Sequence, residues 1–174
     1  MRDFKELISS YDNFPQEGII FRDTLRILQN PNIFNELISR MSSNDFIRDA
    51  DAILSIDARG FIFGTAISMK ISKPMIFARK TGKLPGKLSS QEYKLEYGKD
   101  QLSIQKNSLD RFRSFAIIDD LLATGGTALA AIELVNMFEN KNIIGAGFII
   151  NLPELKGDLK LINKGINIHS LMEF

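Results

Sequence analysis

The sequence has no cysteine and only one histidine, His169. These absences exclude disulfides, thiolate nucleophiles and metal clusters built on cysteine or histidine. The formal net charge is only +1, so the charge balance gives no reason to expect a nucleic acid or a membrane as partner. No apolar stretch approaches transmembrane length, and the N-terminus is too charged for a signal peptide, so we expect a cytoplasmic protein.

The rest of the composition is typical of one globular domain. The 174 residues are 44% hydrophobic and 25% charged, which is enough apolar material for a sizeable core. Apolar, strand-like runs at 51–56, 74–78, 115–118, 142–150 and 166–171 alternate with helical spacing at 31–41, 60–70 and 128–138. This alternation predicts an α/β fold, a mostly parallel twisted sheet with helices on both faces. A further short helix is expected over 3–10, and 101–105 should return as a strand of a hairpin-like flap.

The most informative stretch is 115–127, which reads as a strand, an acidic pair, a glycine turn and a helix. Backbone N–H groups at a helix start bind anions, glycines allow close approach, and threonine hydroxyls add donors. Carboxylates repel phosphate but accept hydrogen bonds from vicinal hydroxyls, so the pattern predicts a ribose 5-phosphate site. The phosphate would lie on Ala123, Thr124, Gly125, Gly126 and Thr127, and the ribose on Asp119 and Asp120. The alternative is a strand that ends in solvated aspartates before an ordinary helix. The Walker pattern is absent, which argues against a P-loop NTPase.

Two other segments have the composition of anion sites. A second strand leads into Asp57, Ala58, Arg59 and Gly60 and then a helix, again a turn at a helix start, now with an arginine. Its alternative is a simple turn in which Arg59 pairs with Asp57. Residues 79–87 are rich in lysine, arginine and glycine, which suits either a solvated loop or a mobile lid over polyphosphate.

The segment 119–127, Asp-Asp-Leu-Leu-Ala-Thr-Gly-Gly-Thr, resembles the phosphoribosyl pyrophosphate (PRPP) motif of type I phosphoribosyltransferases, in the version found in adenine phosphoribosyltransferases. Three more segments are similar to motifs of that family and occur in the same order. They are the Phe-Pro-x-x-Gly stretch at 14–23, the Asp-Ala-Arg-Gly-Phe loop at 57–61, and the Tyr-x-Leu-Glu-Tyr-Gly signature at 93–98. On residues alone, 14–23 would be a hydrophobic loop packed on the sheet; the resemblance makes it a hood over the base.

The resemblance implies a single phosphoribosyltransferase domain, 1–174, with a hood at about 1–30 and a lid at about 80–100. It implies conversion of adenine and PRPP to AMP and pyrophosphate in purine salvage, by a homodimer that uses Mg²⁺ held mainly by PRPP and water. Glu96 and Arg59 would be catalytic, Glu96 as an acid–base or a positioned acceptor. Pyrophosphate would lie on Asp57, Ala58, Arg59, Gly60, Arg79, Lys80 and Lys83, and adenine on Ile20, Phe21, Arg59 and Leu121. A cis peptide between Asp57 and Ala58 is also implied.

Small departures from the family concern Asn151, where an acidic residue is common, and the spacer 87–91. Two rival functions remain open at this point. One is a phosphoribosyltransferase for another base, such as hypoxanthine or xanthine, against which the hood and the Leu-Glu-Tyr-Gly signature argue. The other is a PRPP- or nucleotide-sensing regulator, which would usually need a DNA-binding segment that the sequence does not show.

Overall fold

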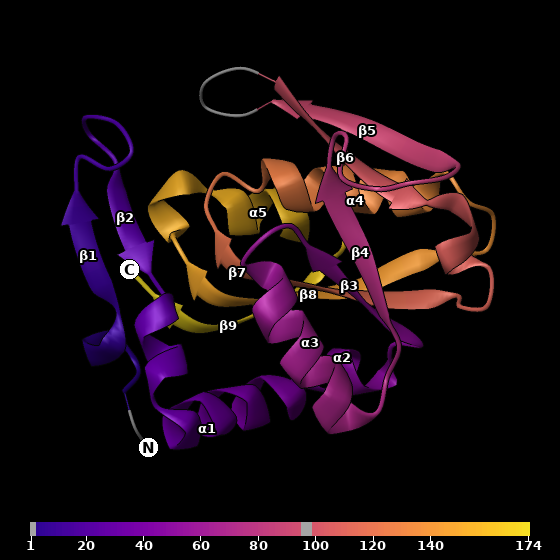
Figure 1. Cartoon of the computed structure of the whole chain (residues 1–174). Helices are drawn as coiled ribbons and strands as arrows, with labels where there is room; N and C mark the ends of the chain where they lie inside the picture. The colour runs from indigo at the N-terminus through magenta and orange to yellow at the C-terminus, as the bar shows by residue number, and fades with distance from the viewer. Residues whose placement is uncertain (1–2, 95–98) are drawn as a thin grey trace.

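The computed structural model describes residues 3–94 and 99–174 (Figure 1). Its strands are β1 (Ser9–Asp12), β2 (Ile20–Asp23), β3 (Ala52–Ile56), β4 (Met75–Lys80), β5 (Leu88–Lys94), β6 (Lys99–Gln105), β7 (Ser114–Leu122), β8 (Asn142–Asn151) and β9 (Asn167–Glu173). Its α-helices are α1 (Pro31–Ser42), α2 (Asp45–Asp49), α3 (Gly60–Ile71), α4 (Gly126–Asn136) and α5 (Gly157–Ile162). Short 3-10 helices lie at η1 (Lys5–Leu7), η2 (Leu25–Gln29), η3 (Lys106–Leu109) and η4 (Pro153–Leu155).

The main sheet has seven strands in the order β5-β6-β4-β3-β7-β8-β9. The pairings β4–β3, β3–β7, β7–β8 and β8–β9 are parallel, whereas β4–β6 and β5–β6 are antiparallel. The mostly parallel α/β fold predicted from the sequence is thereby confirmed. The chain passes from β3 outward to β4 and later returns to β7 on the other side of β3. In open α/β sheets, such a reversal of strand order marks the ligand site, at the carboxyl ends of the strands.

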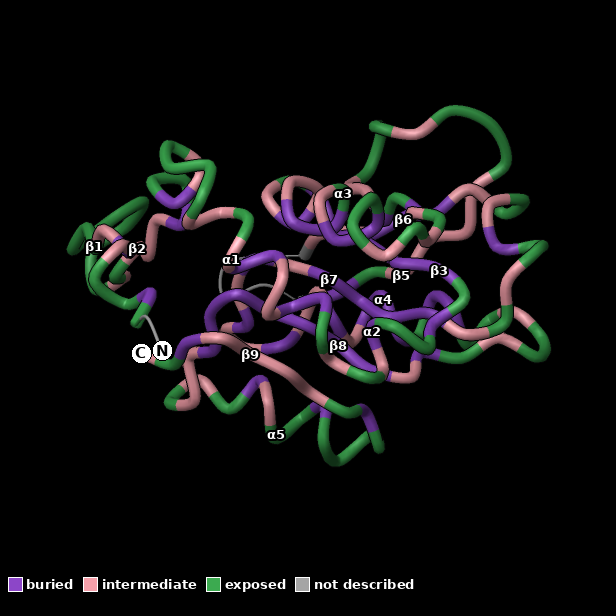
Figure 2. The backbone as a smooth tube through the Cα atoms, turned by 90° about the horizontal axis from the view of Figure 1, so that it is seen from below, coloured by how far each residue is buried: buried purple, intermediate pink, exposed green. Residues whose placement is uncertain are grey.

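Two apolar layers cover the sheet. Helices α1, α2 and α3 lie on one face, and α4 and α5 on the other, where the β5–β6 hairpin also packs against α4 (Figure 1). The central strands are buried on both faces, as the purple colour of β7 and β8 shows in Figure 2. None of the helices in the described part of the chain is long and apolar enough to cross a membrane.

The sequence explains where several elements begin. Asn30 caps α1, its Oδ1 accepting hydrogen bonds of 3.2 Å from the N–H groups of Asn32 and Ile33, and Pro31 occupies the first turn. Strand β7 is longer than the apolar run that predicts it, because it continues through the acidic pair to Leu122 while β8 pairs with it throughout. Helix α4 therefore starts only at Gly126, after Gly125 with a φ of 77°.

The prediction of a helix over 3–10 is wrong beyond one 3-10 turn. Phe4 and Ile8 are buried, but Ser9–Asp12 is not helical and pairs antiparallel with Ile20–Asp23. This two-stranded sheet stands at one side of the main sheet, at the left of Figure 1. The C-terminal ring of Phe174 lies 4.6 Å from the guanidinium of Arg22 in β2 and so ties the end of the chain to this hairpin. The segment predicted to be a hood is thus a small sheet with its own anchor.

Candidate active site

A cavity of about 790 Å³ lies between the β1–β2 hairpin and the carboxyl end of β7. Its lining joins the predicted adenine, ribose and phosphate residues, which are Ile20, Phe21, Arg59, Asp119, Asp120, Leu121, Ala123, Thr124, Gly125, Gly126 and Thr127. A second pocket of about 330 Å³ is lined by Asp57, Ala58, Lys80 and Lys83, together with Arg59, Asp119, Asp120 and Thr127. The two spaces share those last four residues, so they meet at the acidic pair.

The glycine turn opens α4 toward the larger cavity. Gly125 is the N-cap residue of α4, and its positive φ is a conformation in which a side chain would be strained. The backbone N–H groups at this helix start are free of intrahelical partners and suit an anion. Support comes from α5, where Lys160 Nζ donates a 2.9 Å hydrogen bond to the carbonyl of Thr124. Gly157 lies so close that a Cβ on it would fall 2.1 Å from the carbonyl oxygen of Ala123.

Sequence reasoning missed Lys160 and Gly157 as supports of this turn. Lysines and glycines near a helix start are common in any sequence, and these two lie more than thirty positions from the turn they contact. No local signal therefore pointed to them.

The acidic pair lies where β7 passes the pocket. Asp120 is buried, with its Oδ2 2.8 Å from Nε of Arg59, and Asp119 is half-buried, with its Oδ1 accepting a 2.8 Å hydrogen bond from the N–H of Asp120. The alternative in which Arg59 pairs with Asp57 is therefore wrong. Gly60 has no room for a side chain, since a Cβ there would lie 2.7 Å from Oδ1 of Asp119.

Burial sets the ionisation of these two carboxyls. It raises the pKa of Asp119 well above its usual value, and the neighbouring Asp120 charge raises it further. Burial also raises the pKa of Asp120, although the Arg59 guanidinium partly offsets that rise. The pair thus carries a desolvation cost that hydroxyl donors of a ligand could reduce.

The hairpin end of the cavity is aromatic. The guanidinium carbon of Arg59 lies 4.9 Å from the ring centroid of Phe21, and Phe14 meets that ring edge-on at 5.2 Å. Ile20, at the start of β2, exposes about half of its surface and lines the cavity. An apolar, π-rich wall beside main-chain polar groups suits a flat heteroaromatic ring.

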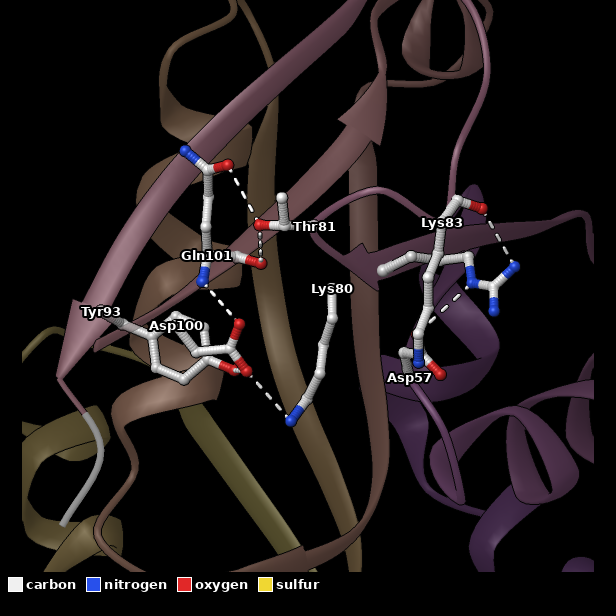
Figure 3. Close-up of polar contacts among 8 residues, drawn as sticks. Asp57, Lys80, Thr81, Lys83, Tyr93, Asp100 and Gln101 are labelled. Atoms are coloured by element: carbon white, nitrogen blue, oxygen red, sulfur yellow. Dashed lines mark hydrogen bonds and ion pairs between the residues drawn. The ribbon is translucent and has the colours of Figure 1, made fainter. Parts of the chain in front are cut away.

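The smaller pocket is highly charged. The peptide between Asp57 and Ala58 is cis, as the resemblance implied. The buried Oδ2 of Asp57 lies 3.1 Å from Nζ of Lys83 and 3.4 Å from Nε of Arg79 (Figure 3). Burial alone would raise the pKa of Asp57, but Lys83, the backbone N–H of Lys80 and Arg79 outweigh it and hold the pKa below its usual value. Asp57 is therefore a carboxylate at neutral pH.

Two residues without a predicted role also belong to this region. Tyr93, quoted above only as part of a signature, lines the smaller pocket, and Asp100 contacts both Tyr93 and Lys80. Glu96, predicted to be catalytic, lies outside the described residues.

A glycine turn, an acidic pair and an arginine-bearing loop at the switch point of a parallel sheet define a phosphoribosyltransferase. The family model "Phosphoribosyl transferase domain" matches residues 23–166. A curated adenine phosphoribosyltransferase of Prochlorococcus marinus (strain AS9601) is 52% identical over 172 residues, covering 99% of both chains. That of Idiomarina loihiensis is 40% identical over 172 residues, covering 99% of this chain and 97% of the relative.

Solved structures agree. The adenine phosphoribosyltransferase of Thermoanaerobacter pseudethanolicus superposes with a TM-score of 0.91 at 37% identity, covering 98% of each chain. The Saccharomyces cerevisiae enzyme, solved with adenine and an imino-altritol bisphosphate, has a TM-score of 0.84 at 35% identity, covering 97% of this chain and 96% of that one. The chain belongs to the adenine phosphoribosyltransferase family, which confirms the resemblance found in the sequence. It is thus an enzyme of the pentosyltransferase class.

Proposed function

We propose that this enzyme transfers the 5-phosphoribosyl group of PRPP to adenine, forming AMP and pyrophosphate in purine salvage. The observation that carries the proposal is the shared lining of the two spaces: Arg59, Asp119, Asp120 and Thr127 border both. A ribose on the acidic pair would therefore have its base and 5-phosphate in the larger cavity and its pyrophosphate in the smaller pocket. The anomeric carbon would lie at the junction, where the leaving group and the incoming base must meet.

The chain's groups suit a displacement at that carbon. The bond from C1 to the pyrophosphate oxygen breaks while the bond from C1 to N9 of adenine forms, through an oxocarbenium-like transition state. Asp119 and Asp120 would hold the ribose hydroxyls and place negative charge beside the developing cation. Lys80, Lys83 and Arg79 would face the departing pyrophosphate. The N9 proton of adenine would pass to Glu96, or to water while Glu96 only accepts a hydrogen bond from the imidazole edge; this role remains a prediction from the sequence.

Adenine would lie against the hood. The Phe21 ring and Leu121 offer apolar contact, and the main-chain N–H and C=O of Ile20 match the N1 acceptor and C6 amino donor of adenine. Nη1 of Arg59 is buried and has no hydrogen-bond partner among the described residues, so it is a donor available to the substrate. A site read by hydrogen bonds rejects hypoxanthine, whose N1 and C6 groups have the opposite pattern.

Magnesium completes the proposal. No group of three or more His, Cys, Asp or Glu side chains within the described residues could form a metal cage. The pocket carboxylates of Asp57 and Asp119 nevertheless fit the coordinated waters of a Mg²⁺ ion, which keeps much of its water and binds phosphate oxygens. Bound with PRPP, the ion would supply charge neutralisation of the pyrophosphate. We expect chelation with EDTA to abolish turnover and added Mg²⁺ to restore it.

We further propose a homodimer. Phe61 of α3 meets Phe77 of β4 edge-on at 4.9 Å, Phe77 is 47% exposed, and Met69, further along α3, is 77% exposed. Exposed apolar side chains that gather on one face of a protein mark interaction sites. In sedimentation experiments the wild type should be a dimer and Met69→Lys a monomer. A monomeric wild type would contradict the proposal. A cytoplasmic location remains a prediction from the sequence.

The direct test is AMP formation from PRPP with adenine, hypoxanthine, guanine and xanthine compared. Adenine should be the preferred substrate by a wide margin. Use of hypoxanthine within tenfold of adenine would contradict the base assignment but not the PRPP site. PRPP binding without any nucleotide formation would instead favour the sensing function.

A further inference from the structure

Asp100 is an acidic residue beside the smaller pocket that the proposed function does not use. It lies on β6 directly opposite Tyr93 of β5. Its Oδ2 lies 3.0 Å from Nζ of Lys80 and accepts a 3.3 Å hydrogen bond from the Tyr93 hydroxyl, and its Oδ1 accepts a 2.8 Å bond from the N–H of Gln101 (Figure 3). Donors on β4, β5 and β6 therefore fix this one carboxylate.

The contact is between two full charges. Burial alone would raise the pKa of Asp100, but the hydrogen bonds from Lys80 and from the N–H of Gln101 outweigh it, so the pKa lies below its usual value. The same contact with Asp100 raises the pKa of Lys80. At neutral pH the pair is therefore a carboxylate and an ammonium, as expected for opposite charges at this separation.

Lys80 lies between the carboxylate of Asp100 and the pocket assigned to pyrophosphate. Its ammonium pairs with Asp100, and its side chain also lines the pocket assigned to pyrophosphate. Arg79 and Lys83 pair with Asp57 instead, so Asp100 acts on Lys80 alone among these three cations. A phosphate group in the pocket and the carboxylate of Asp100 must share one ammonium, and sharing weakens the attraction of that ammonium for phosphate.

We propose that Asp100 sets the affinity of the enzyme for pyrophosphate, by positioning the Lys80 ammonium at the pocket and competing with pyrophosphate for it. Product pyrophosphate is then held less tightly and leaves sooner. The inference rests on the proposed pyrophosphate role of Lys80. Asp100 is a positioning residue that acts through Lys80 and forms no bond to the substrate.

The direction in which one substitution changes pyrophosphate affinity separates this role from a purely structural one. Asp100→Asn keeps the size and can still accept hydrogen bonds from Tyr93 and Gln101, but it removes the competing charge. Pyrophosphate should bind more tightly, by about threefold to fivefold, the upper part of the range for one partly exposed charge pair. If Asp100 only braced the hairpin, the same change would weaken pyrophosphate binding.

The measurement is calorimetric titration of pyrophosphate at fixed MgCl₂ concentration. Asp100→Glu, which keeps the charge, should stay within about twofold of the wild type. Asp110→Asn is the matched control, because it is the same substitution at an exposed aspartate outside both pockets, directly after η3. It should leave the affinity unchanged. Thermal unfolding and AMP formation are measured for each variant to check that the fold is retained. In Asp100→Asn, pyrophosphate should inhibit AMP formation more strongly while the KM for adenine stays constant.

A double-mutant cycle with Lys80→Met tests whether Asp100 acts through Lys80. Lys80→Met should weaken pyrophosphate binding, and Asp100→Asn added to it should tighten binding less than in the wild type. If Asp100→Asn increased pyrophosphate affinity equally with and without Lys80→Met, Asp100 would repel pyrophosphate directly. That result would overturn the proposal that the two anions share Lys80. Unchanged or weaker binding by Asp100→Asn alone would also overturn the inference. Unchanged binding by Lys80→Met would refute the proposed role of Lys80 and the inference with it, while AMP formation by the wild type would still support the overall function.

Discussion

Gly157→Ala is expected to damage the PRPP site from outside it. Gly157 is the first residue of α5, and a Cβ there would lie 2.1 Å from the carbonyl oxygen of Ala123 and 2.8 Å from the N of Gly125. Both are backbone atoms of the turn assigned to the 5-phosphate, so no side-chain rotation can relieve the overlap. Contacts of a Cβ atom shorter than 3.0 Å essentially never occur, so α5 or the turn must move by about 1 Å.

Two effects of this substitution oppose each other. Alanine is favoured over glycine in a helix by about 1 kcal/mol, whereas overpacking costs about 1–3 kcal/mol. We expect the clash to prevail, because α4, α5 and the turn pack together around a buried Gly157. A shift of about 1 Å in positioned groups can cost roughly 10²-fold in activity, so PRPP affinity should fall at least tenfold.

The assay pairs PRPP calorimetry with thermal unfolding. Gly165→Ala is the control: its φ of 77° makes alanine strained, but no atom lies within 4 Å of the added Cβ. That strain costs about 1–2 kcal/mol, or a few degrees in Tm for a domain of this size. The control should lose stability and keep its PRPP affinity, whereas Gly157→Ala should lose affinity. Wild-type PRPP affinity in Gly157→Ala would refute the reasoning.

Three further predictions concern the acidic pair and the hood. Asp119→Asn with Asp120→Asn should weaken PRPP binding at least tenfold, about 1.4 kcal/mol, without unfolding the chain; unchanged affinity by calorimetry would remove the diol assignment. Asp119→Asn alone should raise the free energy of unfolding at neutral pH. The folded-state pKa of Asp119 is raised, so this carboxyl favours folding in acid and loses that contribution as the pH rises through the folded-state value; a lower urea midpoint at neutral pH would contradict this. Finally, kcat/KM should favour adenine over hypoxanthine by roughly 10⁴-fold. Ile20→Pro removes the backbone N–H and should abolish adenine use while PRPP binding stays near normal. Ile20→Val keeps the N–H and should leave adenine use near normal.

The parts of the site that are local in sequence could be predicted from it. Each strand–turn–helix unit, 51–60 and 115–127, combines an apolar run, glycine and helical spacing within a few residues, and the structure forms both. The extent of β7 could not be predicted. Asp119 and Asp120 look like a strand end, but the ladder to β8 continues past them, with Asp119 opposite Phe148 and Leu122 opposite Asn151. Pairing with a distant strand overrides the local signal.

Contacts between segments that are distant in the chain also could not be predicted from the sequence. Asp57 is the nearest carboxylate to Arg59 along the chain, yet the guanidinium pairs with Asp120, which the parallel pairing of β3 and β7 brings alongside. Likewise, Lys80, Tyr93 and Asp100 meet only because β6 lies between β4 and β5. Nothing in the spacing of these residues identifies the order of the strands.

Arg59 shows how the site offsets the cost of its buried acids. Asp120 is almost fully buried, and an uncompensated carboxylate there would be strongly unfavourable. The Arg59 guanidinium pairs with it through Nε while its central carbon lies over the Phe21 ring, so one group neutralises the acid and contacts the aromatic wall. A lysine ammonium is a single point charge and has no planar face to present to the ring. The guanidinium also borders both spaces, so its permanent positive charge lies between the cavity assigned to the base and the pocket assigned to the leaving group. The group that offsets the buried charge of Asp120 therefore also borders the sites proposed for both substrates.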